Sequence, residues 1–244
     1  LHATARAEAF LKAAGLKAGD PQALLDAPAG RLVDALTAAD PINPARGLYF
    51  GPVLDEQFLH RHPFWPDAPA QSASVPMILG NTKDETRNLI GARDPSVFEL
   101  DWASLPARLA AEMRADLSPE LVVAQYRQFY PTYSPADILF AATTASRSWR
   151  GQVEEADARA RQGAPTWVYR MDWPSPLDGG KWGAPHMIDI ALAFGNLTSP
   201  GALTGASASA RRVSDQLGQA FISLARRGNP NHHGLPQWLP HRLP

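Results

Sequence analysis

The order of apolar and polar stretches predicts a chain in which helices surround a few buried strands. Residues 75–80 (VPMILG) form a short, wholly apolar run bounded by proline and glycine, which is typical of a parallel strand buried on both faces. A second β-favouring run, residues 166–173 (TWVYRMDW), stops at Pro174. The polar residues 81–85 (NTKDE) follow the first run directly, in the position where open α/β sheets place their functional sites.

The N-terminal quarter of the chain reads as helical before it becomes irregular. Residues 3–14 are helix formers closed by a glycine, and residues 21–36 form an alanine- and leucine-rich helical region with a break near Pro28. Residues 48–50 (LYF) suggest a short extended piece, and residues 62–69 (HPFWPDAP) suggest a proline-rich loop.

Helical spacing returns between residues 101 and 161 and again near the C-terminus. Ser118 and Ser134 each precede a proline, which predicts an N-cap followed by proline at the first helical position. The charged residues 154–162 (EEADARARQ) are expected to form a solvated face. Residues 208–227 show the clearest amphipathic pattern, with one apolar stripe and two arginines in the last turn.

The amino-acid composition limits which classes of function and partner are open to the chain. The 244 residues are 45% hydrophobic, which is ordinary for a globular protein, and carry a net charge of −1, so nothing favours nucleic acid or an anionic membrane as a partner. No apolar run approaches the ~18 residues that a membrane-spanning helix needs. Cysteine is absent, which excludes disulfides, thiolate metal sites and a cysteine nucleophile. We expect residues 1–244 to be parts of one domain.

His186 is the best candidate for acid–base chemistry, because it ends a proline- and glycine-rich loop after the second predicted strand. A histidine base needs a carboxylate that fixes its tautomer. Glu85, at the end of the first strand, is the best candidate, with Asp84 and Asp172 as alternatives. Without further information, the favoured explanation of Glu85 is a loop carboxylate that caps the turn formed by residues 86–90.

An acid followed by a histidine matches the order Ser…acid…His of α/β-hydrolases, in which a G-x-S-x-G elbow presents the nucleophile. No such elbow occurs in these 244 residues. The nearest segment, residues 205–209 (GASAS), follows the histidine and leads into a helix. It therefore predicts a helix N-cap and not a nucleophile.

Cofactor and metal patterns are weak. No G-x-G-x-x-G is present, and residues 179–181 (GGK) lack the spacing of a Walker loop. His232 and His233 are adjacent and cannot face one metal as an i, i+4 pair would. His60 and His62 lack a nearby carboxylate cluster beyond Asp55 and its neighbour.

Four segments together resemble the type-B carboxylesterases, the family of the bacterial para-nitrobenzyl esterases and the cholinesterases. GPVLDEQFL resembles the family segment PVVDGxFL, and VPMILGNTKDETRNLI resembles VPxLIGxNxDEG, which carries the triad acid. YRMDWPSPLDGGKWGAPHMIDIALAFGN resembles YxFxxxS…GAxHxxExxFvFG, which carries the triad histidine. FISLARRGNPNHHGLPQWLP resembles the ending FAxxGxPN…WPxY. The matches occur in family order over most of the chain.

The resemblance implies that Glu85 is the triad carboxylate and His186 the general base of an ester hydrolase. Asp189, three residues after the histidine where the family usually has glutamate, is implied to be a supporting acid. Thr86 and Glu56 stand where the family commonly has glycine. The implied substrate is a small-molecule ester, and no cofactor, metal ion, nucleic acid or membrane span is implied.

The family's serine elbow and glycine-rich oxyanion loop both precede the segments found here. We therefore expect the C-terminal part of one α/β-hydrolase domain, mostly helical with a few strands of the central sheet, truncated at the N-terminus and at the C-terminus. Such a chain supplies two of three triad members and is expected to be inactive alone. The alternatives are a catalytically inactive, cholinesterase-like interaction module and a fragment without function.

Overall fold

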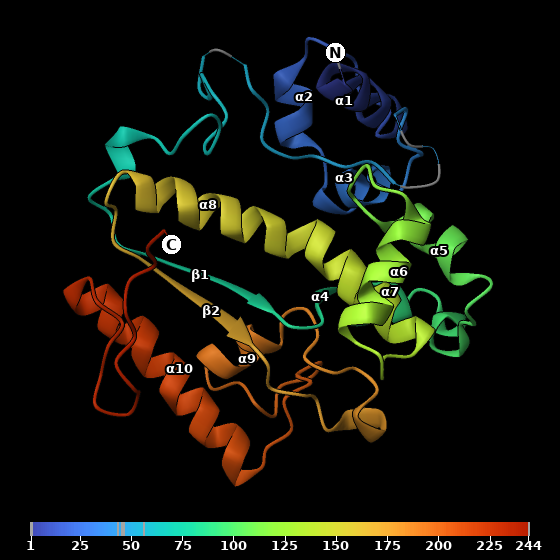
Figure 1. Cartoon of the computed structure of the whole chain (residues 1–244). Coiled ribbons are helices and arrows are strands. Elements are labelled where there is room, and N and C mark those ends of the chain that lie inside the picture. The colour runs from blue at the N-terminus through green and yellow to red at the C-terminus, as the bar shows by residue number, and fades with distance from the viewer. Residues whose placement is uncertain (1, 43, 45–46, 56, 244) are drawn as a thin grey trace. The chain divides into compact units, whose positions relative to one another are not determined.

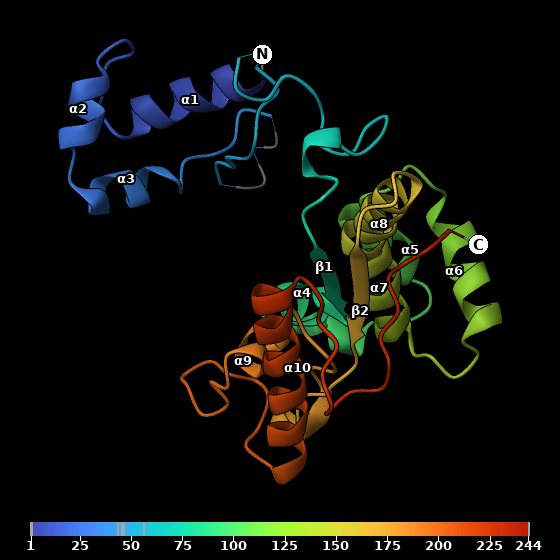
Figure 2. The same cartoon turned by 90° about the vertical axis from the view of Figure 1, so that its left-hand side faces the viewer.

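A computed structural model describes residues 2–42, 44, 47–55 and 57–243 of the chain. It divides into two compact units, Leu1–His62 and Pro63–Pro244, which are described separately below. Figures 1 and 2 show the elements of both units from two directions. Glu56, one of the two departures from the family pattern, lies outside the described residues.

The smaller unit is helical, as its sequence predicts. Its helices are α1 (His2–Ala13), α2 (Pro21–Asp26) and α3 (Ala29–Ala35). Asp20 caps α2 by accepting a hydrogen bond from the Ala23 amide at 2.9 Å, and the break before α3 falls at Pro28. Residues 48–50 form no strand; the chain makes only an isolated antiparallel bridge between Ala39 and Gly47 just before them.

The larger unit contains a parallel pair of strands, β1 (Met77–Thr82) and β2 (Thr166–Met171). They pair in register from Met77 opposite Thr166 to Thr82 opposite Met171. Both predicted strands are therefore confirmed, with β1 displaced two residues toward the C-terminus because the polar Asn81 and Thr82 continue the ladder.

Helices cover both faces of this pair. Helix α8 (Arg150–Arg161) lies on one face, and α9 (Ile188–Ala193) and α10 (Ala208–Arg227) lie on the other, as Figures 1 and 2 both show. The connection between the strands contains α4 (Glu85–Gly91), α5 (Leu105–Glu112), α6 (Pro119–Phe129) and α7 (Pro135–Thr144). In the described part of the chain, no helix is long and apolar enough to cross a membrane.

The predicted caps are confirmed. Ser118 accepts a hydrogen bond from the Leu121 amide, Ser134 and Asp137 form a reciprocal capping box, and Ser207 of the GASAS segment accepts from the Ala210 amide. The helix expected from residue 101 begins only at Leu105, because the Asp101 carboxylate binds the Ser104 amide in a turn before it. The long helix after Pro135 is interrupted by a π-helical turn, Ala145–Trp149.

Two apolar clusters hold the larger unit together. One joins α4, α5, α6 and α7 around the fully buried Ile138, Leu139 and Phe140. The other packs α9 and α10 against the end of β2 through Met171, Ile188, Leu192 and Leu217. The first cluster fixes the helix that begins at Glu85, and the second fixes the helix that follows His186.

Arg159 corrects the expectation that residues 154–162 form a solvated face. Its side chain is 0% exposed and donates hydrogen bonds to the Thr166 hydroxyl at 2.8 Å and to the Val75 carbonyl at 2.6 Å. Helix α8 turns this position toward β2, as the burial of Ala156 one turn earlier also shows. A buried guanidinium requires such partners, so Arg159 joins the segment before β1 to α8 and β2.

Candidate active site

The loop that carries His186 lies beside the segment that follows β1. The Lys83 amide donates to the Met171 carbonyl at 2.9 Å, which extends the strand pairing by one residue. The Asp84 amide then donates to the Ala184 carbonyl at 2.9 Å, and the Ala184 amide donates to the Asp84 carboxylate at 2.8 Å. These bonds bring together two segments that are 100 residues apart in sequence.

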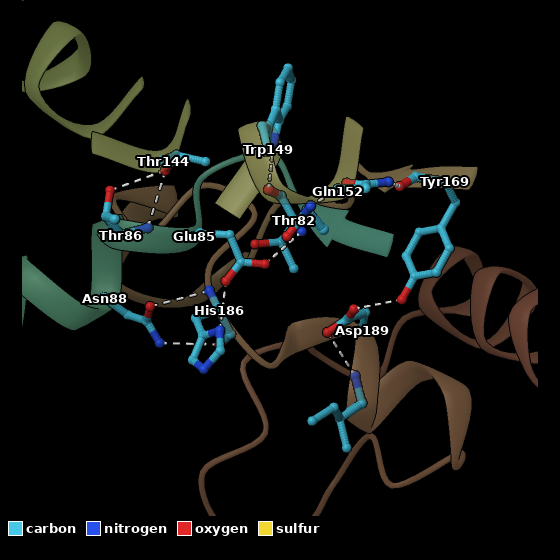
Figure 3. Close-up of polar contacts among 12 residues, drawn as sticks. Thr82, Glu85, Thr86, Asn88, Thr144, Trp149, Gln152, Tyr169, His186 and Asp189 are labelled. Carbon is cyan, nitrogen blue, oxygen red and sulfur yellow. Dashed lines mark hydrogen bonds and ion pairs between the residues drawn. The ribbon is translucent and has the colours of Figure 1, made fainter. Parts of the chain in front are cut away.

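Glu85 and His186 form a hydrogen-bonded pair. His186 Nδ1 lies 2.6 Å from Glu85 Oε2, and Glu85 Oε1 accepts from the Thr82 amide at 2.8 Å (Figure 3). The Glu85 side chain is 9% exposed, whereas that of His186 is 41% exposed. Because a carboxylate can only accept, Nδ1 carries the proton and Nε2 is left as the basic nitrogen on the accessible ring.

The backbone of His186 is held by Asn88. The His186 amide donates to Asn88 Oδ1 and the Asn88 Nδ2 donates to the His186 carbonyl, both at 3.2 Å. The next residue, Met187, has a φ of 72°, a left-handed conformation that is costly for a side chain of this kind. Helix α4 therefore carries both Glu85, which binds the ring of His186, and Asn88, which binds its backbone.

Asp189 lies near this pair but is bonded elsewhere. The Tyr169 hydroxyl donates to Asp189 Oδ2 at 2.7 Å, and the Ile190 amide donates to Oδ1 at 3.1 Å. Burial, together with the negative charges of Asp189 and Glu85, raises the pKa of Tyr169 far above its ordinary value of 10.0. The phenol therefore remains protonated and serves as a donor.

The alternative acids have other partners. Asp84 is occupied by the Ala184 amide, and Asp172 pairs with Arg170, whose Nε lies 2.6 Å from the Asp172 carboxylate at the surface. The interpretation of Glu85 as a helix cap is wrong. Glu85 is the first residue of α4, but its carboxylate faces His186 and the Thr82 amide, which precedes the helix.

Thr86 replaces the family's common glycine and is anchored by α7. Its amide donates to Thr144 Oγ1 at 3.2 Å, and its hydroxyl donates to the Phe140 carbonyl at 3.0 Å and lies 2.7 Å from Thr143 Oγ1. All three threonine side chains are buried. The first turn of α4, and with it Glu85, is thus fixed to a helix of the core.

The candidate metal ligands lie apart. Within residues 2–42, 44, 47–55 and 57–243, no group of three histidine, aspartate or glutamate side chains is placed to hold a metal ion. His232 has both ring nitrogens occupied, since Nε2 contacts the Gln216 carbonyl at 3.0 Å and Nδ1 accepts from the Gly234 amide at 3.1 Å. Its ring therefore has no nitrogen free for a cation.

Sequence reasoning singled out Glu85 and His186, which the structure brings together, and did not single out Tyr169 and Asn88. Tyr169 occupies an apolar strand as any packing residue would. Its hydroxyl is the one sequence feature that could have indicated a polar partner. Asn88 follows the acid by three residues, so it shares the helical face of Glu85. Its clamp on His186 depends on a tertiary contact between residues 98 positions apart.

The chain is similar to known esterases in sequence and in structure. The profile of the Carboxylesterase family matches residues 2–242. The chain is 29% identical over 195 residues to phenmedipham hydrolase of Pseudarthrobacter oxydans, an alignment that covers 78% of this chain and 38% of that protein. It superposes on the crystal structure of a Geobacillus stearothermophilus carboxylesterase at pH 6.2 with a TM-score of 0.72 and 30% identity, covering 97% of this chain and 48% of that one.

A PNB esterase structure gives a TM-score of 0.66 at 24% identity, over 98% of this chain and 48% of the other, which supports the fold. The chain thus spans about half the length of these solved relatives. The α/β class expected from the sequence is confirmed, with β1 and β2 forming part of an α/β-hydrolase sheet. The chain belongs to the Carboxylesterase family.

Proposed function

We propose that this chain supplies the acid and the base of a carboxylic ester hydrolase that uses a Ser-His-Glu triad. The observation that carries the proposal is the 2.6 Å contact between His186 Nδ1 and Glu85 Oε2. His186 Nε2 takes the proton of the attacking serine and returns it to the leaving alcohol. Glu85 orients the ring and stabilises the imidazolium, while Asp189 supports the pair from α9.

The serine and the oxyanion amides are proposed to come from the part of the family's fold that these residues do not contain. The absence of a G-x-S-x-G segment from the sequence supports this view, as does the coverage of only about half of each solved relative. The accessible His186 ring is consistent with a missing neighbour on its Nε2 side. Small-molecule carboxylic esters are the proposed substrates, and the reaction requires no cofactor.

The Glu85–His186 pair can be tested in the chain as it stands. We expect nitrogen-15 NMR of the His186 ring, above the pH range in which histidine titrates, to show the Nδ1-protonated tautomer. Glu85→Gln should abolish this preference or reverse it. Asp157→Asn is the matched control, because Asp157 binds the remote His241 at Nε2 over 2.8 Å. A His186 tautomer unchanged by Glu85→Gln would overturn the proposed triad pair.

The proposed missing serine can be tested by activity. Without the nucleophile, we expect the chain to show no p-nitrophenyl ester hydrolysis above the level of His186→Ala. Turnover by this chain that disappears in His186→Ala would overturn the division of the triad. Such turnover would require a nucleophile within these 244 residues.

The alternative is an interaction module without catalysis, and one observation favours it. Phe194, directly after α9, is 75% exposed, so a large apolar ring lies on the surface of the larger unit. A pure interaction module has no chemical need for the fixed His186 tautomer, so the NMR experiment distinguishes the two. A fragment without function is expected to lack a cooperative thermal transition.

A further inference from the structure

The side chain of Asn88 binds both backbone groups of one residue, His186. Its Oδ1 accepts from the His186 amide and its Nδ2 donates to the His186 carbonyl, each at 3.2 Å (Figure 3). The amide belongs to the peptide plane before the Cα atom of His186, and the carbonyl belongs to the plane after it. Holding both planes fixes φ and ψ of this residue, and therefore the direction in which its side chain leaves the backbone.

The residue after His186 has a backbone conformation that needs support. Met187 has φ 72° and ψ 0°, in the left-handed region that a residue with a Cβ atom keeps only where its surroundings hold it. Among the residues that the structure describes, Asp178 is the one other residue with a side chain at positive φ, and aspartate tolerates this region better than methionine does. Met187 is 56% exposed, so packing of its own side chain contributes little to holding the turn.

Backbone contacts on the two sides of Met187 hold the turn instead. On the C-terminal side, the Met187 carbonyl accepts from the Ile190 amide at 3.1 Å where α9 begins, and Ile188 is buried in the apolar cluster of α9 and α10. On the N-terminal side, φ of Met187 is the rotation of its Cα atom against the peptide plane that contains the His186 carbonyl. Asn88 Nδ2 binds that carbonyl, so the plane cannot rotate toward an ordinary φ without breaking this hydrogen bond.

The position of the His186 ring depends on the same contact. The acceptor of the ring proton, Glu85 Oε2, lies 2.6 Å from Nδ1, and the other carboxylate oxygen is held by the Thr82 amide at 2.8 Å. The carboxylate is therefore not free to follow a displaced ring. A histidine that loses such an acceptor distributes its proton between both ring nitrogens.

We propose that Asn88 is a positioning residue that acts through the backbone of His186. By holding the peptide planes on both sides of this residue, it maintains the left-handed turn at Met187 and keeps the imidazole on Glu85. This inference rests on the proposed function of the Glu85–His186 pair and deepens it. Both hydrogen bonds of the Asn88 amide go to the backbone of the histidine, so its effect is on where the ring lies and which nitrogen carries the proton.

The test compares two asparagines that make the same kind of contact. Asn231 Nδ2 donates to the Trp238 carbonyl at 2.8 Å, and the Trp238 amide donates to Asn231 Oδ1 at 2.6 Å. Asn231 and Asn88 are both half-buried. In nitrogen-15 NMR of the histidine ring, we expect Asn88→Ala to lower the Nδ1-protonated population of His186 at least twofold. Asn231→Ala removes the same pair of hydrogen bonds from another loop and should leave this population unchanged.

Two further variants test the turn itself. Met187→Gly, added to Asn88→Ala, should restore at least half of the lost population, because glycine adopts the left-handed conformation without support. Asn88→Asp keeps an acceptor for the His186 amide but has no donor for the carbonyl. It should also lower the Nδ1-protonated population, and it replaces Asn88→Ala in the comparison if that variant does not fold.

Three results would overturn the positioning role of Asn88. These are an unchanged His186 tautomer in the folded Asn88 variant, an equal effect of Asn231→Ala, and no recovery on adding Met187→Gly. Glu85→Gln separates this failure from that of the proposed function. If Glu85→Gln leaves the tautomer unchanged, the proposed triad pair itself fails. If Glu85→Gln changes the tautomer and the Asn88 variant does not, only the role of Asn88 fails.

Discussion

Gly80 offers the sharpest stability test of how β1 and β2 fit together. Its φ is not in the left-handed region, so the backbone itself accepts alanine. The obstacle is the ring of Tyr169, whose Cζ, Cε1 and Cε2 would lie 1.9, 2.0 and 2.5 Å from the new methyl carbon. Real Cβ atoms do not approach other heavy atoms this closely, so the ring or the strand must move.

The size of the effect follows from three terms. Overpacking by one methyl group in a fitted site costs about 1–3 kcal/mol. Moving the ring loses the Tyr169–Asp189 hydrogen bond, and a bond to a charged group contributes about 1.5–3 kcal/mol. The reduced freedom of the unfolded chain on replacing glycine returns about 0.4–1 kcal/mol. We therefore expect Gly80→Ala to lower the free energy of unfolding by about 1.5–5.5 kcal/mol.

Urea unfolding of the wild type and variants measures this loss, with the slope of free energy against urea checked for constancy. Tyr169→Ala removes the ring, so the alanine at position 80 should cost nothing further in the double variant. Tyr169→Phe should not rescue Gly80→Ala, because the clashing carbons remain. A Gly80→Ala protein within about 0.5 kcal/mol of wild type, the range of neutral surface changes, would refute the proposed fit.

Two further predictions concern α4 and α7. Thr86→Val removes a buried hydroxyl that binds the Phe140 carbonyl, and should lower the free energy of unfolding by about 1–3 kcal/mol. The control is Thr37→Val, which removes an exposed hydroxyl and should leave the free energy of unfolding nearly unchanged. Equal losses in the two variants would contradict the role of burial. Burial opposes ionisation of Asp137, but hydrogen bonds from Ser134 and Arg87 outweigh it and hold the Asp137 pKa below 3.8. The ionised carboxylate therefore stabilises the folded state above pH 3.8, and this stabilisation is lost as the pH falls further. Asp137→Asn should flatten the fall in stability below pH 4 in unfolding curves, and parallel curves would refute this.

The sequence located the candidate site residues where local pattern and chain order carried the information. The apolar run of residues 75–80 located β1, because a strand buried on both faces shows no alternation. Glu85 and His186 followed from their positions at strand and loop ends, and from motifs in family order. Their 2.6 Å contact stays invisible in sequence, since it joins residues 101 positions apart.

Arg159 and Tyr169 show why the rest was not predicted. A charged residue in a charged segment favours solvent on average, yet the turn of α8 directs Arg159 inward, where the Thr166 hydroxyl and backbone carbonyls receive it. Tyr169 fits the pattern of a packing residue in a strand, and the close approach of its ring to β1 depends on the missing side chain of Gly80. Both depend on which faces meet in three dimensions, and residue type alone does not determine that.

The contacts that hold the proposed acid–base pair all come from this chain. Helix α4 carries Glu85 in its first turn and Asn88 one turn later, so one rigid element sets both the carboxylate at Nδ1 and the backbone of His186. Thr86 fixes that element to α7, and the amide of Thr82 fixes the second carboxylate oxygen of Glu85. Every one of these contacts lies within the larger unit. In the proposed triad, the orientation of His186 would therefore not depend on the serine, because these contacts fix the ring and its backbone without a nucleophile.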